Sequence, residues 1–247
     1  MNEPESSQDL ISKLVYVLMP ARRPPEHLRK WYDEAYSCWQ EVWSDAFSEL
    51  HPGQRLNSDA FTRQDEIGAL FLGDECIGLT AFSYADFFRP PTLCDSYFNN
   101  WPREVIDKVI GHINQEDGLP GTVLVVNNLT VRKKYRRSAY GISMKDLLHG
   151  IFVSRWLGSQ SGVMIATPRI NRRINDICFK WGALPIAKEV PSGHGDYVDL
   201  VIFLKNRVDS EIKKNDLYFI VQRLWQGRLD TELNPETEEA YELKKAG

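Results

Sequence analysis

The sequence predicts a mixed α/β fold, in which a largely antiparallel central sheet carries helices on its faces. Short apolar runs alternate with longer segments in which apolar residues recur at helical spacing. Glu66–Leu72 and Cys76–Ser83 are joined by Gly73-Asp74-Glu75, which is typical of a β-hairpin. Further along, strand and helix patterns alternate as in β-α-β crossovers, which indicates a sheet with both parallel and antiparallel pairs.

Strands are predicted from short, partly β-branched apolar runs bounded by turn residues. They span Leu14–Met19, Glu66–Leu72, Cys76–Ser83, Thr122–Val131, Val163–Ala166, Leu184–Val190 and Tyr197–Leu204. Pro20 ends the first strand, and the last two flank a Pro-Ser-Gly-His-Gly turn.

Helices are predicted where apolar residues recur every three or four positions. They span Pro25–Leu50, Pro102–Gln115, Ile142–Leu157, Asn171–Trp181 and Asn215–Trp225. The tryptophans of the first helix, Trp31, Trp39 and Trp43, are interpreted as packing on the sheet rather than as a ligand surface.

The 247 residues suit one large domain or one domain with an extension. We expect a domain over residues 1–206, with an aromatic-rich helical insert at residues 86–121. After Asn206 the composition becomes charged, so residues 207–247 are predicted as a C-terminal helical extension. This extension would cap the domain or mediate a homodimer.

Composition argues against several classes of protein. The formal net charge of −4 gives no global attraction to nucleic acid. No apolar run approaches the roughly 18 residues that span a bilayer, and the polar Met1–Asp9 segment is unlike a signal peptide. The cysteines are scattered without ligand-spaced histidines, which predicts reduced thiols and no metal. We expect a soluble, cytoplasmic protein without a membrane or nucleic-acid partner.

The segment Asn127–Ile142, NNLTVRKKYRRSAYGI, contains the clearest candidate for a binding site. A strand ends, a basic loop follows and a helix begins, and the unpaired N–H groups at a helix N-terminus attract anions. Small residues let a phosphate approach the backbone, and arginines donate charge-assisted hydrogen bonds. The segment contains the arginines Arg136 and Arg137 and the small residues Ser138, Ala139 and Gly141. The segment predicts a phosphate cradle, with a solvated basic run or a nucleic-acid or targeting patch as the alternative.

These residues resemble the cofactor motif of the GNAT (N-acetyltransferase) superfamily, Arg/Gln-x-x-Gly/Ala-x-Gly/Ala. Arg136–Gly141 fits it as Arg-x-x-Ala-x-Gly, after a strand that ends at Val131. A second GNAT signature, Asn-x-x-Ala-x-x-Leu-Tyr-x-x-x-Gly-Phe, is similar in spacing to the segment from Asn171 to Gly182. The order of predicted strands and helices also resembles that of the superfamily.

The resemblance implies a GNAT-like sheet of about seven strands, with a splayed fourth and fifth pair. It also implies that acetyl-CoA or another acyl-CoA donates an acyl group to a small-molecule or peptide amine by direct attack. Strand backbone would bind the pantetheine arm and the loop N–H groups the pyrophosphate. The implied binding residues are Leu129, Thr130, Val131, Arg136, Arg137, Ser138, Ala139, Tyr140, Gly141, Ile142 and Asn171.

The catalytic positions depart from the GNAT pattern. Cys178 stands where the superfamily has a thiolate-protonating Tyr, and it would donate a proton or only fill the core. The central strand lacks a Glu base, and its Asn128 can orient an acceptor or a water but cannot act as a base. His194, in the last turn, has an ordinary pKa of about 6.5 that suits base catalysis, unless it is only solvated. Asn128, Cys178 and His194 are therefore the catalytic candidates, with Glu189, Asp196 and Asp199 as weaker ones.

Two questions stay open at the level of the sequence. The aromatic insert would form a lid over an apolar acceptor or a long acyl chain, or a satellite core. The alternatives to an N-acetyltransferase are a longer-chain acyltransferase that uses acyl-CoA or an acyl carrier protein, and a catalytically silent CoA-binding module. A nucleic-acid-binding function is disfavoured by the net charge.

Overall fold

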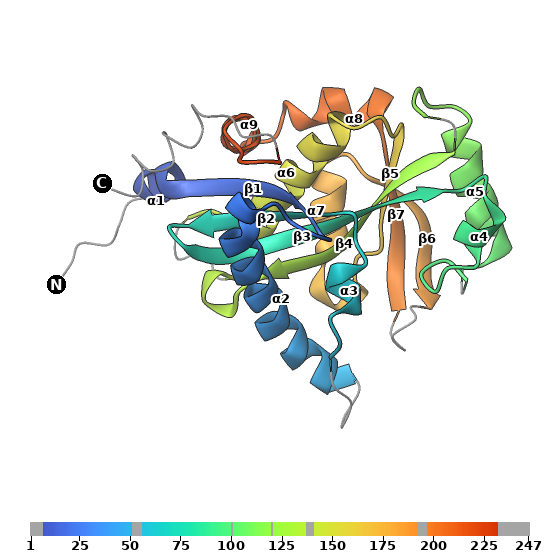
Figure 1. Ribbon diagram of the computed structural model, residues 1–247. Helices are drawn as coiled ribbons and strands as arrows, with labels where there is room; N and C mark the ends of the chain where they lie inside the picture. Colours follow the sequence, from blue (N-terminus) through green and yellow to red (C-terminus); the bar gives the residue numbers. More distant parts are fainter. Residues whose placement is uncertain are drawn as a thin grey trace. The chain divides into compact units, whose positions relative to one another are not determined.

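The computed structural model describes residues 7–50, 56–99, 101–119, 121–136, 141–191 and 197–231. Within these ranges seven strands form a sheet in the order β1-β2-β3-β4-β5-β7-β6 (Figure 1). The β4–β5 pair is parallel, whereas β1–β2, β2–β3, β5–β7 and β6–β7 are antiparallel. The predicted mixed, largely antiparallel sheet is confirmed.

The strands follow the predicted pattern closely. They are β1 (Leu14–Pro20), β2 (Glu66–Leu72), β3 (Glu75–Asp86), β4 (Thr122–Val131), β5 (Val163–Ala166), β6 (Leu184–Pro191) and β7 (Tyr197–Leu204). The bounds of β2, β4, β5 and β7 are those predicted. β3 runs three residues past the predicted end at Ser83, because Ala85 still turns a buried side chain inward.

The helices differ more from the prediction at their ends. They are α1 (Ser7–Lys13), α2 (Arg29–Leu50), α3 (Asp59–Thr62), α4 (Pro90–Leu93), α5 (Arg103–Ile113), α6 (Met144–Leu157), α7 (Ile174–Lys180), α8 (Lys205–Ile212) and α9 (Tyr218–Gln226). The helix predicted from Asn171 is interrupted, because Arg173 adopts a left-handed φ of 52° that an α-helix cannot continue through. A short 3-10 turn, Ile170–Arg172, therefore precedes α7.

The chain divides into two compact units, which we describe separately. Unit 1 comprises Met1–Phe82, Asn128–Phe152 and Phe219–Gly247, and unit 2 comprises Ser83–Asn127 and Val153–Tyr218. The predicted boundary after residue 206 falls inside unit 2, and α9 belongs to unit 1. The extension as a separate segment stays a prediction.

In unit 1, α2 packs on one face of β1, β2 and β3 (Figure 1). Successive strand residues point to opposite faces, so Val15, Val17 and Met19 of β1 join this core while Tyr16 faces the other side. Trp31 and Trp39 of α2 are buried against the sheet, which confirms their predicted packing role. On the opposite face, the Tyr16 ring contacts Trp225 of α9 at 6.2 Å between centroids.

The free edge of β1 is covered by the chain that follows α9. Leu18 N–H donates to Leu229 O at 2.8 Å, and Leu229 N–H donates to Tyr16 O at 3.0 Å. These two bonds add a short parallel bridge to the sheet edge. Covering an edge strand in this way removes a template for pairing with another chain.

In unit 2, the aromatic insert packs into the core. Phe87, Phe98 and Trp101 are buried, and Phe98 makes edge-on ring contacts with the other two. They share a hydrophobic cluster with α5 and with inward residues of the strands in this unit. These contacts favour the satellite-core interpretation of the insert over the lid.

Three general properties follow from the described residues. No helix in the described part of the chain is long and apolar enough to cross a membrane. No group of three or more His, Cys, Asp or Glu side chains within the same residues is arranged to hold a metal ion. The cysteines are free thiols, of which Cys38, Cys76 and Cys178 are buried and Cys94 is exposed.

Candidate functional site at the end of strand β4

β4 continues beyond its parallel partner. β5 is only four residues long, and its pairing with β4 covers Val123–Val126, whereas β4 runs on to Val131. The second half of β4 contains Asn128, whose φ of 54° places it in the left-handed region. Asn tolerates this conformation better than most residues because its short side chain can bond locally. The backbone of β4 is therefore irregular just beyond the residues that pair with β5.

A chain of hydrogen bonds holds this irregular stretch of β4. The Asn128 amide donates to Ala60 O at 2.7 Å, which ties the strand to α3. The buried Thr130 hydroxyl donates to Asn128 O at 2.7 Å and accepts from Trp43 Nε1 at 2.9 Å. The side chains of Asn128 and Thr130 are thus engaged in holding the strand.

Close packing of β3 against β4 depends on Gly78. A Cβ atom at this position would lie 2.6 Å from Thr130 O and 2.9 Å from Leu148 Cδ1. Both distances are shorter than real Cβ contacts, so only glycine fits without displacing backbone. Gly78 thereby lets α6 and the end of β4 approach β3.

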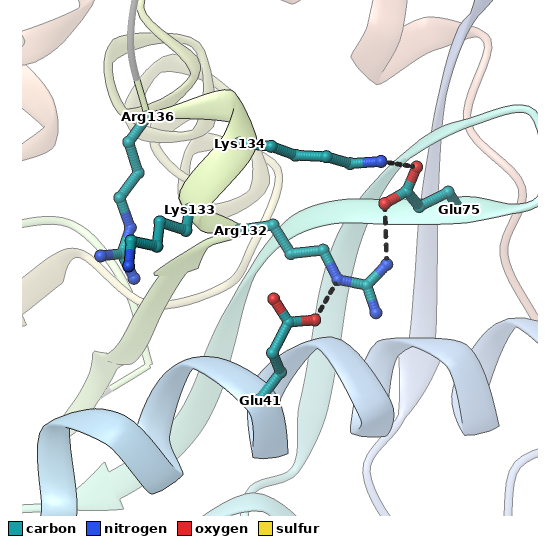
Figure 2. Close-up of a pocket in the computed structure, with 6 residues that line it drawn as sticks. All are labelled: Glu41, Glu75, Arg132, Lys133, Lys134 and Arg136. Atoms are coloured by element: carbon teal, nitrogen blue, oxygen red, sulfur yellow. Dashed lines mark hydrogen bonds and ion pairs between the residues drawn. The ribbon is translucent and has the colours of Figure 1, made fainter.

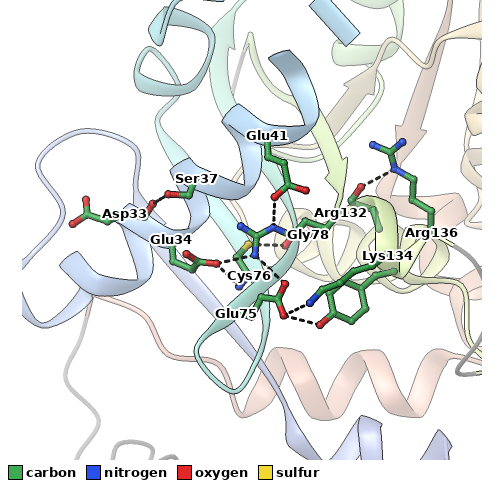
Figure 3. A network of polar contacts seen from close by, with 12 residues as sticks. Asp33, Glu34, Ser37, Glu41, Glu75, Cys76, Gly78, Arg132, Lys134 and Arg136 are labelled. Carbon is green, nitrogen blue, oxygen red and sulfur yellow. Dashed lines mark hydrogen bonds and ion pairs between the residues drawn. The ribbon is translucent and has the colours of Figure 1, made fainter. Parts of the chain in front are cut away.

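Arg132, the first residue after β4, is held by three carboxylates (Figure 3). Its NH1 group contacts Glu34 Oε1 at 2.9 Å and Glu75 Oε1 at 3.1 Å, and its Nε contacts Glu41 Oε2 at 2.9 Å. The Arg132 side chain is only 12% exposed. A guanidinium is suited to this position because its planar fork presents several donors in a fixed geometry. The ion pairs join α2 and β3 to the end of β4.

The 3-10 turn Lys133–Tyr135 is anchored mainly by the second oxygen of Glu75. Glu75 Oε2 accepts hydrogen bonds from Lys134 Nζ at 2.6 Å and from the Tyr135 hydroxyl at 2.9 Å. Partial burial opposes ionisation of Glu75, but the hydrogen bonds from Lys134, Tyr135 and Arg132 outweigh it and lower the pKa of its carboxyl. Burial, followed by the bond to Glu75, raises the pKa of Tyr135 to about 12. Glu75 is therefore ionised, and Tyr135 is a neutral donor, at neutral pH.

A groove of about 870 Å³ opens at this turn (Figure 2). It is lined by Glu41, Glu75, Arg132, Lys133, Lys134 and Arg136. Arg136 Nε donates to Val131 O at 2.9 Å, which leaves its two terminal nitrogens without a partner among the described residues. The Lys133 ammonium likewise has no ion pair or hydrogen bond within the described part of the chain. Four cations face two carboxylates, and two of the cations are uncommitted, so the groove suits an anion.

The structure describes seven of the eleven predicted binding residues. Leu129, Thr130, Val131 and Arg136 lie in continuous order at the end of β4 and in the turn after it. Gly141 has a φ of 71° and Ile142 is half-buried, just before α6 begins at Met144. Asn171 lies in the 3-10 turn before α7. Arg137, Ser138, Ala139 and Tyr140 lie outside the described residues.

The structure describes two of the three catalytic candidates, Asn128 in unit 1 and Cys178 in unit 2. Cys178 is buried in α7, and burial raises the pKa of its thiol to about 12, which favours the core interpretation over proton donation. Asn128 uses its amide to hold α3. His194 and Asp196 lie outside the described residues. Asp199 accepts hydrogen bonds from Asn175 Nδ2 and Glu189 N–H, so it holds local structure in unit 2.

Sequence reasoning missed the carboxylates that surround Arg132. Glu34 and Glu41 are seven residues apart and so lie on one face of α2, which is the only local signal that connects them. Neither they nor Glu75 show any sequence relation to Arg132. The structure brings these carboxylates together, because α2 packs on the strand that carries Glu75.

No protein-family model matches the chain, and no curated protein matches its sequence. Among solved structures, the chain is similar to FeeM, an N-acyl amino acid synthase from uncultured soil microbes, with a TM-score of 0.54 and 10% identity over 80% of this chain and 93% of that one. The chain has a GNAT-like fold.

Two further similarities to solved structures have lower scores. The AHL synthase LasI has a TM-score of 0.46 and 9% identity over 90% of this chain and 98% of its own. The aminoglycoside acetyltransferase AAC(6')-Ib, solved with coenzyme A and kanamycin, has a TM-score of 0.47 and 12% identity over 78% of this chain and 95% of its own. The similarity to FeeM and the observed strand order confirm the predicted GNAT-like fold, while the roles of individual site residues stay predictions.

Proposed function

We propose that the protein is an N-acyltransferase that moves an acyl group from acyl-CoA, in the simplest case acetyl-CoA, to the amine of a small molecule or peptide. The observation that carries this proposal is the groove at the end of β4, where Lys133 and Arg136 offer uncommitted cationic donors. In the sequence, the segment that lines the groove is followed by Gly141 and by α6, which begins at Met144, in a GNAT-like fold. A phosphate-bearing thioester is the kind of donor that such a fold and such a groove would accept together.

The residues at this site fit the parts of an acyl-CoA molecule. Phosphate groups would be bound by Lys133, Arg136 and the N–H groups before α6, which the helix dipole of α6 reinforces. The backbone of Leu129, Thr130 and Val131 would bind the pantetheine arm alongside the part of β4 that runs past β5. The side chains of Asn128 and Thr130 would not bind the pantetheine arm, because their hydrogen bonds hold the strand in place.

The reaction in this proposal is a direct transfer. The amine nitrogen bonds to the thioester carbonyl carbon, the carbon–sulfur bond breaks, the amine loses a proton, and the departing thiolate gains one. Holding the two substrates in line supplies much of the rate acceleration in such reactions. Among the catalytic candidates, His194 has the side chain suited to accept the amine proton near neutral pH. We propose it as the base, and we propose no protein acid for the thiolate, since Cys178 is buried with a raised pKa.

Thermal unfolding with a panel of CoA thioesters tests the proposal. A ligand present at about 100 times its Kd stabilises a protein by about 2.7 kcal/mol, which is readily measured. We expect acetyl-CoA, or the preferred longer acyl-CoA, to raise the Tm of the wild type and to raise it much less in Lys133→Ala/Arg136→Ala. Arg29→Gln, which removes an exposed cation of α2 away from the groove, serves as the matched control and should keep the full shift.

The same panel separates the alternatives. Turnover of an acyl-CoA with an amine in the presence of that stabilisation would support the enzyme. Binding of CoA without turnover of any thioester would support a catalytically silent CoA-binding module. No stabilisation by any thioester in a folded protein would contradict the proposal.

A further inference from the structure

One carboxylate that lines the groove, that of Glu75, contacts several residues of the segment that presents Lys133 and Arg136. Glu75 is the first residue of β3, and its backbone is fixed because it pairs with Leu72 across the β2–β3 hairpin. One of its oxygens contacts Arg132, and the other contacts Lys134 and Tyr135. Glu34 and Glu41, by contrast, contact Arg132, which precedes the turn. Among the contacts of the described residues, those of Glu75 therefore join the start of β3 to Arg132 and to two residues of the turn, Lys134 and Tyr135.

The backbone of the turn transmits this anchoring to the groove. Tyr135 N–H donates to Arg132 O at 2.9 Å, and Arg136 N–H donates to Lys133 O at 3.3 Å. Lys133 and Arg136 thus share a hydrogen-bonded turn with the residues that Glu75 holds. The contacts of Glu75 therefore help to set the positions of Lys133 and Arg136, in addition to the bond that Arg136 Nε makes with Val131 O.

We infer that Glu75 is a positioning residue for the acyl-donor site: its ionised carboxylate holds the turn Lys133–Tyr135 so that Lys133 and Arg136 face an anionic donor. The inference rests on the proposed function for the identity of that donor. Glu75 acts through other residues, because both of its oxygens are already engaged by Arg132, Lys134 and Tyr135.

The experiment compares Glu75→Gln with wild type by hydrogen–deuterium exchange and by CoA titration. Asp74→Asn is the matched control, because Asp74 lies next to Glu75 on the same hairpin and its carboxylate pairs with Lys30 of α2. Tyr135→Phe is a second variant, which removes the hydroxyl that bonds to Glu75 and keeps the aromatic ring. All variants are first checked for an unchanged far-UV spectrum and cooperative unfolding.

In Glu75→Gln we expect amide exchange of Tyr135 and Arg136 to accelerate, and the Kd for CoA to rise, each by at least about tenfold, the factor expected for one charge-assisted hydrogen bond. Tyr135→Phe should also accelerate this amide exchange and raise the Kd for CoA, but by a smaller factor. Asp74→Asn should change neither the exchange rate nor the Kd. In turnover, the KM for acyl-CoA should rise while kcat changes little.

The two ways of failing are distinguishable. If wild-type protein binds no CoA, the proposed function is contradicted, and the exchange data still decide whether Glu75 holds the turn. If CoA binds to wild type but exchange and Kd are the same in Glu75→Gln, the inference is overturned while the proposed function stands. An equal effect of Asp74→Asn would also overturn it, since the effect would then belong to the hairpin charge in general.

Discussion

Glu75 and Tyr135 are 60 residues apart in the sequence, and the Tyr135 hydroxyl donates a hydrogen bond to Glu75 Oε2 at 2.9 Å. This contact joins the start of β3 to the turn that follows β4. Together with the ion pairs of Arg132, it fixes the end of β4, where the candidate donor site begins. Four predictions test how residues in this part of the molecule and around it contribute to the stability of the fold.

Arg132→Ala should lower the free energy of unfolding by about 2–3 kcal/mol, because it leaves three carboxylates close together without their shared cation. Urea unfolding followed by circular dichroism measures the effect. Arg63→Ala, which breaks an exposed ion pair with Asp59, is the control and should change stability by less than about 0.5 kcal/mol. Equal effects of the two variants would show that the Arg132 cluster has no special role in stability.

Gly78→Ala and Gly111→Ala should change the free energy of unfolding in opposite directions. At Gly78 the added methyl group meets Thr130 O and Leu148, so we expect a loss of about 1–3 kcal/mol in the free energy of unfolding. At Gly111, inside α5, a Cβ meets nothing within 4 Å, so alanine should stabilise the protein by about 0.5–1 kcal/mol. Thermal and urea unfolding of both variants give the comparison. A neutral Gly78→Ala would mean that β3 and β4 can separate at little cost.

Asn128→Gly and Asn128→Ala separate the side-chain bond from the backbone conformation at the irregular point of β4. Both lose the hydrogen bond to Ala60 O, worth about 1 kcal/mol, but glycine keeps the left-handed φ at no steric cost. Alanine should therefore be less stable than glycine by a further 1 kcal/mol or so. Urea unfolding of the two variants is the measurement, and an alanine variant as stable as glycine would contradict the role of the left-handed backbone.

His149 should make stability depend on pH between about 6.5 and 4. It is buried in α6, and burial lowers its pKa to about 4, whereas in the unfolded chain the ordinary value is about 6.5. In this window the unfolded state binds a proton that the folded state does not. The free energy of unfolding therefore falls as pH falls, by about 1.4 kcal/mol per unit.

Unfolding at pH 7.5 and pH 5.5 measures this dependence above the range in which most carboxylates titrate. In His149→Gln, the difference in the free energy of unfolding between pH 7.5 and pH 5.5 should be smaller than in wild type by about 1 kcal/mol. His27→Gln, at an exposed histidine, is the control and should keep the wild-type dependence. An unchanged pH dependence in His149→Gln would show that His149 is not the titrating group.

Much of the fold could be predicted because its signals are local. Apolar runs with β-branched residues specified β4, β5 and β7 to the residue, and the Gly73-Asp74-Glu75 turn specified the β2–β3 hairpin. The break before α7 could not be predicted in this way, since Arg173 carries no signal for its left-handed φ. The role of the aromatic insert could not be predicted from the sequence either. Its aromatic residues are evident there, but only their burial with α5 in the structure favours a satellite core over a lid.

For the candidate site, the sequence by itself determined the segment and its chemistry: a strand that ends at Val131, a run of basic residues, and a helix that follows. Only the tertiary structure decided which of those basic residues are available. Arg132 and Lys134 are engaged by carboxylates from α2 and β3, whereas Lys133 and the terminal nitrogens of Arg136 line the groove without a partner among the residues that the structure describes. The physical reason is that an ion pair between residues 57 to 98 positions apart leaves no trace in local spacing. It forms because apolar packing places α2 on the face of the strand that carries Glu75.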